Sequence, residues 1–137
     1  MERSGHITRE FVAAINEHDT KWLSTLMTED HEFVDALGER VRGRELMLQG
    51  WRKYFSLMPD YRLEIDNIIA EGSLVGLFGR ASGTFTTDGN LRPENAWRIP
   101  VAVRATVDGE RIQKWQVFAD NKPVYEIMAR VGPPKSK

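Results

Sequence analysis

The chain has 137 residues, 41% of them hydrophobic and 28% charged, a composition that is typical of one globular domain and argues against disorder. Its 19 basic and 20 acidic residues give a net charge of −1, so the sequence offers no basic surface for nucleic acid or for an anionic membrane. Cysteine is absent, which excludes disulfides and thiolate sites, and the lack of a long apolar run or apolar leader predicts a cytoplasmic protein.

The first segment with helical periodicity begins near Ser4 or Thr8 and ends near His18. Its apolar residues recur at the spacing of one helix face, which predicts an amphipathic helix. Asp19 follows in the position of a capping residue for a short second helix. We expect the first strand at residues 31–35.

A third helix is predicted over residues 44–57, where apolar residues follow the i, i+4, i+7 spacing and Pro59 ends the pattern. From Tyr61 the period changes to two, as strands require. The strands are expected from residue 61 to a turn at 71–73, and then at 74–85, 97–107 and 111–118. Pro100 lacks a donor for the ladder, so it indicates a bulge or a free edge.

Helices followed by a run of antiparallel strands predict an α+β domain. We expect three N-terminal helices packed on one face of a curved, mostly antiparallel sheet. The chain should form a single domain over residues 1–137, with a frayed tail at 132–137.

A family resemblance rests on short motifs in a fixed order. The motifs are Phe33-Val34-Asp35, Gly43-Arg44, Met58-Pro59-Asp60-Tyr61, Gly83-Thr84-Phe85 and the run from Asp108 to Asp120. From residue 11 to about residue 128 the chain resembles the nuclear transport factor 2-like superfamily, and within it the SnoaL-like branch. That superfamily includes polyketide cyclases, ketosteroid isomerases and non-catalytic proteins, so the resemblance implies a cone-shaped α+β barrel but no particular reaction.

The resemblance also implies a blind, mostly apolar cone that holds a small hydrophobic molecule. The residues expected to line it, from the resemblance and from strand alternation, are Phe11, Ile15, Phe33, Asp35, Tyr54, Met58, Trp97, Ile99, Val101, Trp115 and Val117. For each of them the alternative is a plain core position. Several large rings around one cone favour a flat, hydrophobic ligand.

Asp35 is the candidate catalytic residue, because the resemblance matches it to the proton-shuttling aspartate of ketosteroid isomerases. A carboxylate in an apolar cone loses hydration, which suits it to general acid–base chemistry. The alternative is a loop aspartate that accepts hydrogen bonds from backbone amides or from Arg40, Arg42 or Arg44.

Tyr54 is the candidate hydrogen-bond donor to a substrate oxygen. Ketosteroid isomerases use a tyrosine on the first helix and a protonated acid on a strand as donors. In this chain Phe11 stands where that tyrosine would fall. Residues 97–107 contain no Asp or Glu at all. The indoles of Trp97 and Trp115 are alternative donors. These departures argue against a steroid isomerase.

Asp120 matches an acid–base aspartate that polyketide cyclases carry after a late-strand tryptophan. Strict alternation turns Asp120 outward, so only a bulge would aim it at the cone. The alternative is that it caps the turn at residues 121–123. The sequence also departs from the pattern of the related epoxide hydrolase, because Val117 stands where that pattern has an aspartate.

His6, His18 and His31 lack the spacing of metal ligands, so we expect neither a metal nor another cofactor. His18 and His31 are expected to be solvated at the ends of their elements. The resemblance also implies a homodimer that pairs through the outer face of the sheet. The residues expected to contribute are Leu74, Phe78, Ala102 and Phe118.

The sequence therefore favours a SnoaL-like protein that binds a small hydrophobic molecule and acts as an isomerase or cyclase through Asp35. Its substrate would be a polyketide-like or other enolisable carbonyl compound. The alternative is a non-catalytic ligand-binding or dimeric scaffold module of the same fold.

Overall fold

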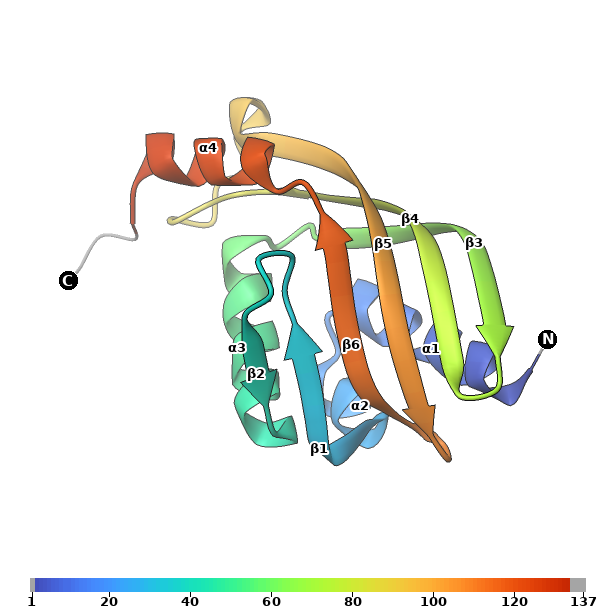
Figure 1. The fold of residues 1–137 in the computed structure, drawn as a ribbon. Helices are drawn as coiled ribbons and strands as arrows, with labels where there is room; N and C mark the ends of the chain where they lie inside the picture. The colour runs from blue at the N-terminus through green and yellow to red at the C-terminus, as the bar shows by residue number, and fades with distance from the viewer. Residues whose placement is uncertain (1, 134–137) are drawn as a thin grey trace.

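The computed structural model describes residues 2–133 and confirms the predicted α+β arrangement (Figure 1). The helices are α1 (Arg3–Asn16), α2 (Thr20–Thr25), α3 (Arg44–Leu57) and α4 (Lys122–Val131), with a 3-10 turn η1 at Pro93–Asn95. The strands are β1 (Met27–Val34), β2 (Arg40–Arg42), β3 (Arg62–Glu71), β4 (Leu74–Thr84), β5 (Ala96–Asp108) and β6 (Arg111–Ala119).

The strands form one open, mixed sheet in the order β2-β1-β6-β5-β4-β3. Every neighbouring pair is antiparallel except β1 and β6, which run parallel. This one pairing joins the N-terminal half of the chain to its last strand. Register shifts in β1–β6, β3–β4 and β5–β6 mark bulges, which add twist and bend the sheet.

The first three helices lie on one side of the sheet, behind it in the view of Figure 1. Helix α1 contacts β3, β4, β5 and β6, while α3 contacts β1. Phe11 and Ile15 of α1 are both fully buried, as its apolar face predicts. Asp19 caps α2 as expected, because its Oδ1 accepts a hydrogen bond of 2.9 Å from the backbone N–H of Trp22. Within residues 2–133 no helix is long and apolar enough to cross a membrane.

Two elements were not predicted. Helix α4 occupies residues 122–131, where only a turn was expected, and β2 is a strand of three residues. In addition β1 begins at Met27 rather than at His31. Of the predicted tail, Gly132 ends α4 by donating its N–H to the carbonyl of Met128 at 2.9 Å, and residues 134–137 lie outside the described residues.

His31 was expected to be solvated, and this prediction is wrong. Its side chain is completely buried in the middle of β1, with Nδ1 2.8 Å from the carbonyl oxygen of Ile112.

The prediction of a free edge at Pro100 is confirmed. Pro100 pairs with Arg80 of β4, but the ladder to β6 reaches only Val101, so no β6 residue needs an N–H from Pro100.

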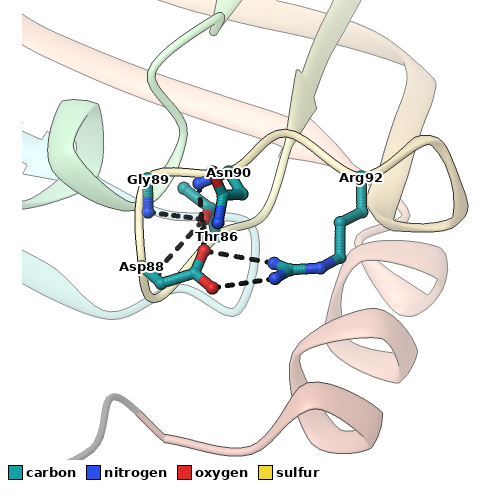
Figure 2. Close-up of polar contacts among 5 residues, drawn as sticks. All are labelled: Thr86, Asp88, Gly89, Asn90 and Arg92. Carbon is teal, nitrogen blue, oxygen red and sulfur yellow. Dashed lines mark hydrogen bonds and ion pairs between the residues drawn. The ribbon is translucent and has the colours of Figure 1, made fainter.

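The loop between β4 and β5 is held by its own side chains (Figure 2). Asp88 accepts two hydrogen bonds from the Arg92 guanidinium, at 2.8 and 3.1 Å, and one from the backbone N–H of Asn90 at 2.9 Å. The bond from Arg92 is the largest cause that holds the pKa of Asp88 well below its usual value. Arg130 of α4 donates to the Glu94 carbonyl at 3.0 Å and to Asn95 Oδ1 at 2.9 Å. The loop therefore anchors α4, which lies beyond the end of β6 (Figure 1).

Candidate functional site

A cavity of about 350 Å³ is lined by the inner face of the sheet together with helices α3 and α4. Its aromatic lining residues are Phe33, Trp51, Tyr54, Tyr61, Trp97, Trp115 and Tyr125. Its aliphatic lining includes Ile15, Val41, Leu63, Ile99, Val101, Val103, Val117 and Val124. Small-molecule sites span about 300–1,000 Å³, so this volume suits a compact ligand.

Most of the residues predicted to bind a ligand lie on this wall. They are Ile15, Phe33, Tyr54, Trp97, Val101, Trp115 and Val117, together with Ile99 and Asp35. Phe11 and Met58 are not among the lining residues. Phe11 lies with its ring centroid 4.7 Å from that of Trp115, and the Met58 sulfur accepts the indole N–H of Trp97 at 3.3 Å. Phe11 and Met58 therefore contact the lining residues Trp115 and Trp97 without lining the cavity themselves.

Asp35 lines the cavity directly after β1 and is half-buried. Its Oδ1 accepts hydrogen bonds of 2.9 Å from the backbone N–H groups of Leu37 and Glu39. These bonds fix the turn between β1 and β2. Within residues 2–133, Oδ2 accepts no hydrogen bond. The arginines named as possible partners bond elsewhere: Arg40 and Arg42 each contact Glu32 at 2.9 Å, and Arg44 donates to the Met27 carbonyl at 3.4 Å. One carboxylate oxygen thus holds the loop, while the other has no hydrogen-bond partner among the described residues.

Tyr54 and Tyr61 meet edge to face on the cavity wall, with ring centroids 4.9 Å apart. Burial raises the pKa of both hydroxyls well above the usual value for tyrosine. Both side chains therefore stay protonated at any physiological pH and can donate a hydrogen bond. Neither hydroxyl donates or accepts one within the described part of the chain.

Trp51 of α3 also lines the cavity, and its Nε1 is buried without a hydrogen-bond partner among residues 2–133. Its helix position indicated a buried face but not a polar role. Tyr61 is likewise a lining residue that the predicted site omitted, although strand alternation placed it beside Leu63 on the inner face. The lining residues from α4 were missed because that helix was not predicted.

Asp120 does not line the cavity. It is exposed, and its Oδ1 accepts the backbone N–H of Lys122 at 3.0 Å, which is the capping alternative. Asp120 lies instead on a surface groove of about 440 Å³ between the β1–β2 turn and α4. Ala36, Asn121 and Tyr125 line both the groove and the cavity, so the two spaces adjoin there.

The cavity wall has little charge. Asp35 is its one charged side chain, and no Lys, Arg or His from residues 2–133 lines it. In the same part of the chain no group of three His, Asp or Glu side chains is arranged to hold a metal ion. The described lining of the cavity thus offers one carboxylate, neutral hydroxyl and indole groups, and aromatic surface.

Comparison with solved structures shows the same fold in several proteins of low sequence identity. A SnoaL-like polyketide cyclase candidate from Shewanella putrefaciens CN-32 is 19% identical to this chain, with a TM-score of 0.80. The alignment covers 95% of this chain and 98% of that one. A ketosteroid isomerase-like protein from Catenulispora acidiphila DSM 44928, solved with trimethylamine, is 21% identical, with a TM-score of 0.76 and 90% and 92% covered. An LEH-like epoxide hydrolase of M. tuberculosis is 16% identical, with a TM-score of 0.77 and 93% and 86% covered.

No curated protein gives a significant match to the sequence. The family model of the SnoaL-like domain, by contrast, matches residues 8–115. This match spans most of the chain, from α1 through β5 into β6, and includes the cavity-lining residues of α1, α3, β3, β4 and β5, but not those of α4. It agrees with the motifs from Phe33 to Trp115 and with the fold. The chain therefore belongs to the SnoaL-like family.

Proposed function

We propose that this protein binds a compact, largely aromatic molecule in the cavity and uses Asp35 to move a proton on it. The supporting observation is that, among residues 2–133, Asp35 is the one charged side chain on an aromatic wall and one of its oxygens has no hydrogen-bond partner. Such a group can take a proton from a bound carbon acid, because water is largely displaced and the base is held in place.

The substrate class proposed is an enolisable carbonyl compound, as for an isomerase or cyclase. Asp35 Oδ2 takes the proton on the carbon beside the carbonyl, and the electron pair of that C–H bond becomes the carbon–carbon double bond of an enolate. The carbonyl oxygen takes up the negative charge. The Tyr54 hydroxyl is a neutral donor on the same wall and can stabilise that oxygen. Return of the proton to another carbon completes an isomerisation.

A model reaction tests this proposal without knowledge of the natural substrate. 2-Tetralone is a compact aromatic ketone with acidic hydrogens, and their exchange in D₂O can be followed by NMR. Wild-type protein should accelerate the exchange saturably, and Asp35→Asn should lower the rate by about 10²–10⁴-fold while 2-tetralone still binds. Asp120→Asn is the matched control, since Asp120 lies outside the cavity, and it should keep the wild-type rate.

The second candidate is a non-catalytic binding module of the same fold. The two amide hydrogen bonds to Asp35 Oδ1 favour it, because they give this carboxylate a role in the turn. Under this alternative 2-tetralone binds but exchanges no faster than in buffer, and Asp35→Ala, which removes the acceptor of both bonds, lowers the melting temperature. Saturable binding with unaccelerated exchange would therefore reject proton transfer by Asp35.

A further inference from the structure

The surface groove between the β1–β2 turn and α4 borders directly on the cavity. Ala36, Asn121 and Tyr125 line both spaces. Along the turn the lining passes from one space to the other in three successive residues. Asp35 lines the cavity, Ala36 lines both spaces, and Leu37 lines the groove. The turn therefore leads from the carboxylate to the surface of the protein.

Helix α4 shows the same order around its axis. Val124 and Met128 line the cavity alone, whereas Glu126 and Ala129 line the groove alone. An α-helix turns by about 100° per residue, which places Tyr125 between these two pairs. Tyr125 lines both spaces, as this position requires. One helix thus forms a wall of the cavity and a wall of the groove, with Tyr125 at the border.

The groove offers apolar surface that the protein leaves in contact with water. Its apolar lining residues are Ala36, Leu37, Ala119, Tyr125 and Ala129. Three of them are alanines, and their small side chains leave space that larger ones would fill. Leu37 is 68% exposed and Tyr125 is 43% exposed. A molecule that covers these two side chains removes apolar surface from water, which favours its binding.

The charged side chains of the groove argue for a neutral occupant. Asp120, Lys122 and Glu126 are all exposed, so they stay hydrated at the rim. Two of the three are acidic, and an anionic chain would therefore find no excess of positive charge in the described lining. The groove measures about 440 Å³ beside a cavity of about 350 Å³. A ring system that fills the cavity leaves this second space for a further part of the same molecule.

We infer that the cavity and the groove form one binding site, whose ligand has a compact head in the cavity and an apolar chain in the groove. This inference rests on the proposed function, because it extends the ligand of the same cavity. The chain leaves the cavity beside Asp35 and is therefore attached near the carbonyl group. Tyr125 borders its path, and an exposed side chain changes rotamer rapidly enough to admit it. The groove thus selects ligands by the length of their chain.

Isothermal titration calorimetry with acetophenone, butyrophenone and hexanophenone tests the inference. These ketones share the ring and the carbonyl group and differ only in the length of the alkyl chain. The affinity of the wild-type protein should rise about three- to fourfold with each added methylene group. Ala129→Trp fills the groove, so it should lower the hexanophenone affinity by about tenfold and leave the acetophenone affinity unchanged.

Leu46→Trp is the matched control for the added indole. Leu46 lies on α3, is 56% exposed and lines neither the cavity nor the groove. This variant should keep the wild-type affinity for all three ketones.

The wild-type protein provides a second measurement if Ala129→Trp does not fold. Leu37 and Ala129 line the groove but not the cavity, so their methyl resonances report on the groove alone. Both should shift in NMR spectra when hexanophenone is added, and neither should shift with acetophenone. The Leu46 methyl resonances should stay in place with either ketone.

Four outcomes would overturn the inference. In the first, hexanophenone binds the wild-type protein no more tightly than acetophenone does. In the second, Ala129→Trp keeps the wild-type affinity for hexanophenone. In the third, the Leu37 and Ala129 methyl resonances do not shift at saturation with hexanophenone. In the fourth, these resonances shift with protein concentration in the absence of any ketone, which assigns the groove to a second copy of the chain.

Failure of the proposed function looks different. In that case the preference for the longer chain and the shifts in the groove remain. The protein then fails to accelerate exchange of the hydrogens beside the carbonyl group of hexanophenone, or Asp35→Asn leaves that rate unchanged.

Discussion

At the scale of single residues, the buried nitrogens Trp51 Nε1 and His31 Nε2 have no hydrogen-bond partner among residues 2–133. Trp51 lines the cavity, but its Nε1 atom is covered by the protein. His31 lies outside the lining, with Nδ1 bonded to the Ile112 carbonyl and Nε2 buried near the ring of Phe11. Nδ1 must carry a proton to donate to a carbonyl oxygen, and burial of Nε2 without an acceptor lowers the pKa of His31 and so disfavours a second proton there. His31 is therefore a neutral core residue.

The stability of the protein should depend on the ionisation of His31. Burial is the largest cause that lowers the pKa of His31 below its ordinary value of 6.5, despite the nearby carboxylates of Asp30 and Glu32. As the pH falls below about 6.5, the unfolded chain takes up a proton at this residue and the folded protein does not. We expect the melting temperature to decrease as the pH is lowered from about 7 to 5.

His31→Gln should remove this part of the pH dependence, since glutamine does not titrate. His6→Gln is the control, because His6 is exposed on α1 and should leave the slope unchanged. Melting curves recorded by circular dichroism across the same pH range compare the three proteins. An equal slope in wild type and His31→Gln would show that other groups govern the acid sensitivity.

At the scale of elements, the bulge in β3 depends on a glycine in β4. The β3–β4 register shifts between Ile65 and Asn67, and Gly79 lies opposite Ile65. A Cβ atom on Gly79 would lie 1.8 Å from the Glu64 carbonyl oxygen, which is a backbone atom and cannot rotate away. The two backbones approach so closely there that only glycine fits.

Gly79→Ala should therefore be strongly destabilising, by about 3 kcal/mol, because the ladder must separate to admit a methyl group. Gly76→Ala in the same strand is the matched control. Its added Cβ would contact only the Phe78 ring, at 3.7 Å, so we expect a change within about 1 kcal/mol. Urea denaturation measures both free energies of unfolding. Similar values for the two variants would show that β3 moves away at little cost.

The elements differ in how well their residues specify them. Helix α3 matches its predicted bounds, and β4, β5 and β6 match within about a residue, because apolar periodicity is strong there. Helix α4 was missed because Pro123 was interpreted as part of a turn, although proline also favours the first turn of a helix. The spacing of Val124, Ile127, Met128 and Val131 was the signal that could have found it. Strand β2 has three residues, and only its pairing with β1 defines it.

The cavity-lining residues could be predicted as far as strand alternation shows which face of the sheet each residue occupies. Alternation selects the side of the sheet on which Trp97 and Trp115 lie, and both line the cavity. Periodicity does not report depth, so Phe11 and Met58 could not be recognised as a second layer. The hydrogen bonds of Asp35 and the unpaired Nε1 of Trp51 depend on three-dimensional contacts, which no local pattern encodes.

At the scale of the whole molecule, the outer face of the sheet carries an apolar row. Phe78, Ala102 and Phe118 are in register across β4, β5 and β6, and the two phenylalanines are 47% and 49% exposed. Leu74 adds a partly exposed side chain on β4. Exposed apolar rows of this kind are typical of protein–protein contacts. We propose that two copies of the chain pair through this face.

Light scattering at micromolar concentration should give a mass of about twice the 15.7 kDa of the chain. Phe118→Asp should shift the protein toward the monomer, since it replaces an exposed apolar side chain of the proposed contact with a charge. Leu91→Asp is the control, because Leu91 is 47% exposed but lies in the β4–β5 loop. A monomeric mass for the wild-type protein would reject the dimer.

The parallel pairing of β1 with β6 also bears on how the protein is made. These strands meet across more than half of the sequence, and the His31–Ile112 contact spans 81 residues. During synthesis β1 must wait for β6 to leave the ribosome, and until then the edge of β1 opposite β2 has no strand to pair with. An unpaired edge is prone to aggregation, and contacts of long sequence separation fold slowly. We therefore expect chaperones to be needed to protect the nascent chain from aggregation until β6 emerges.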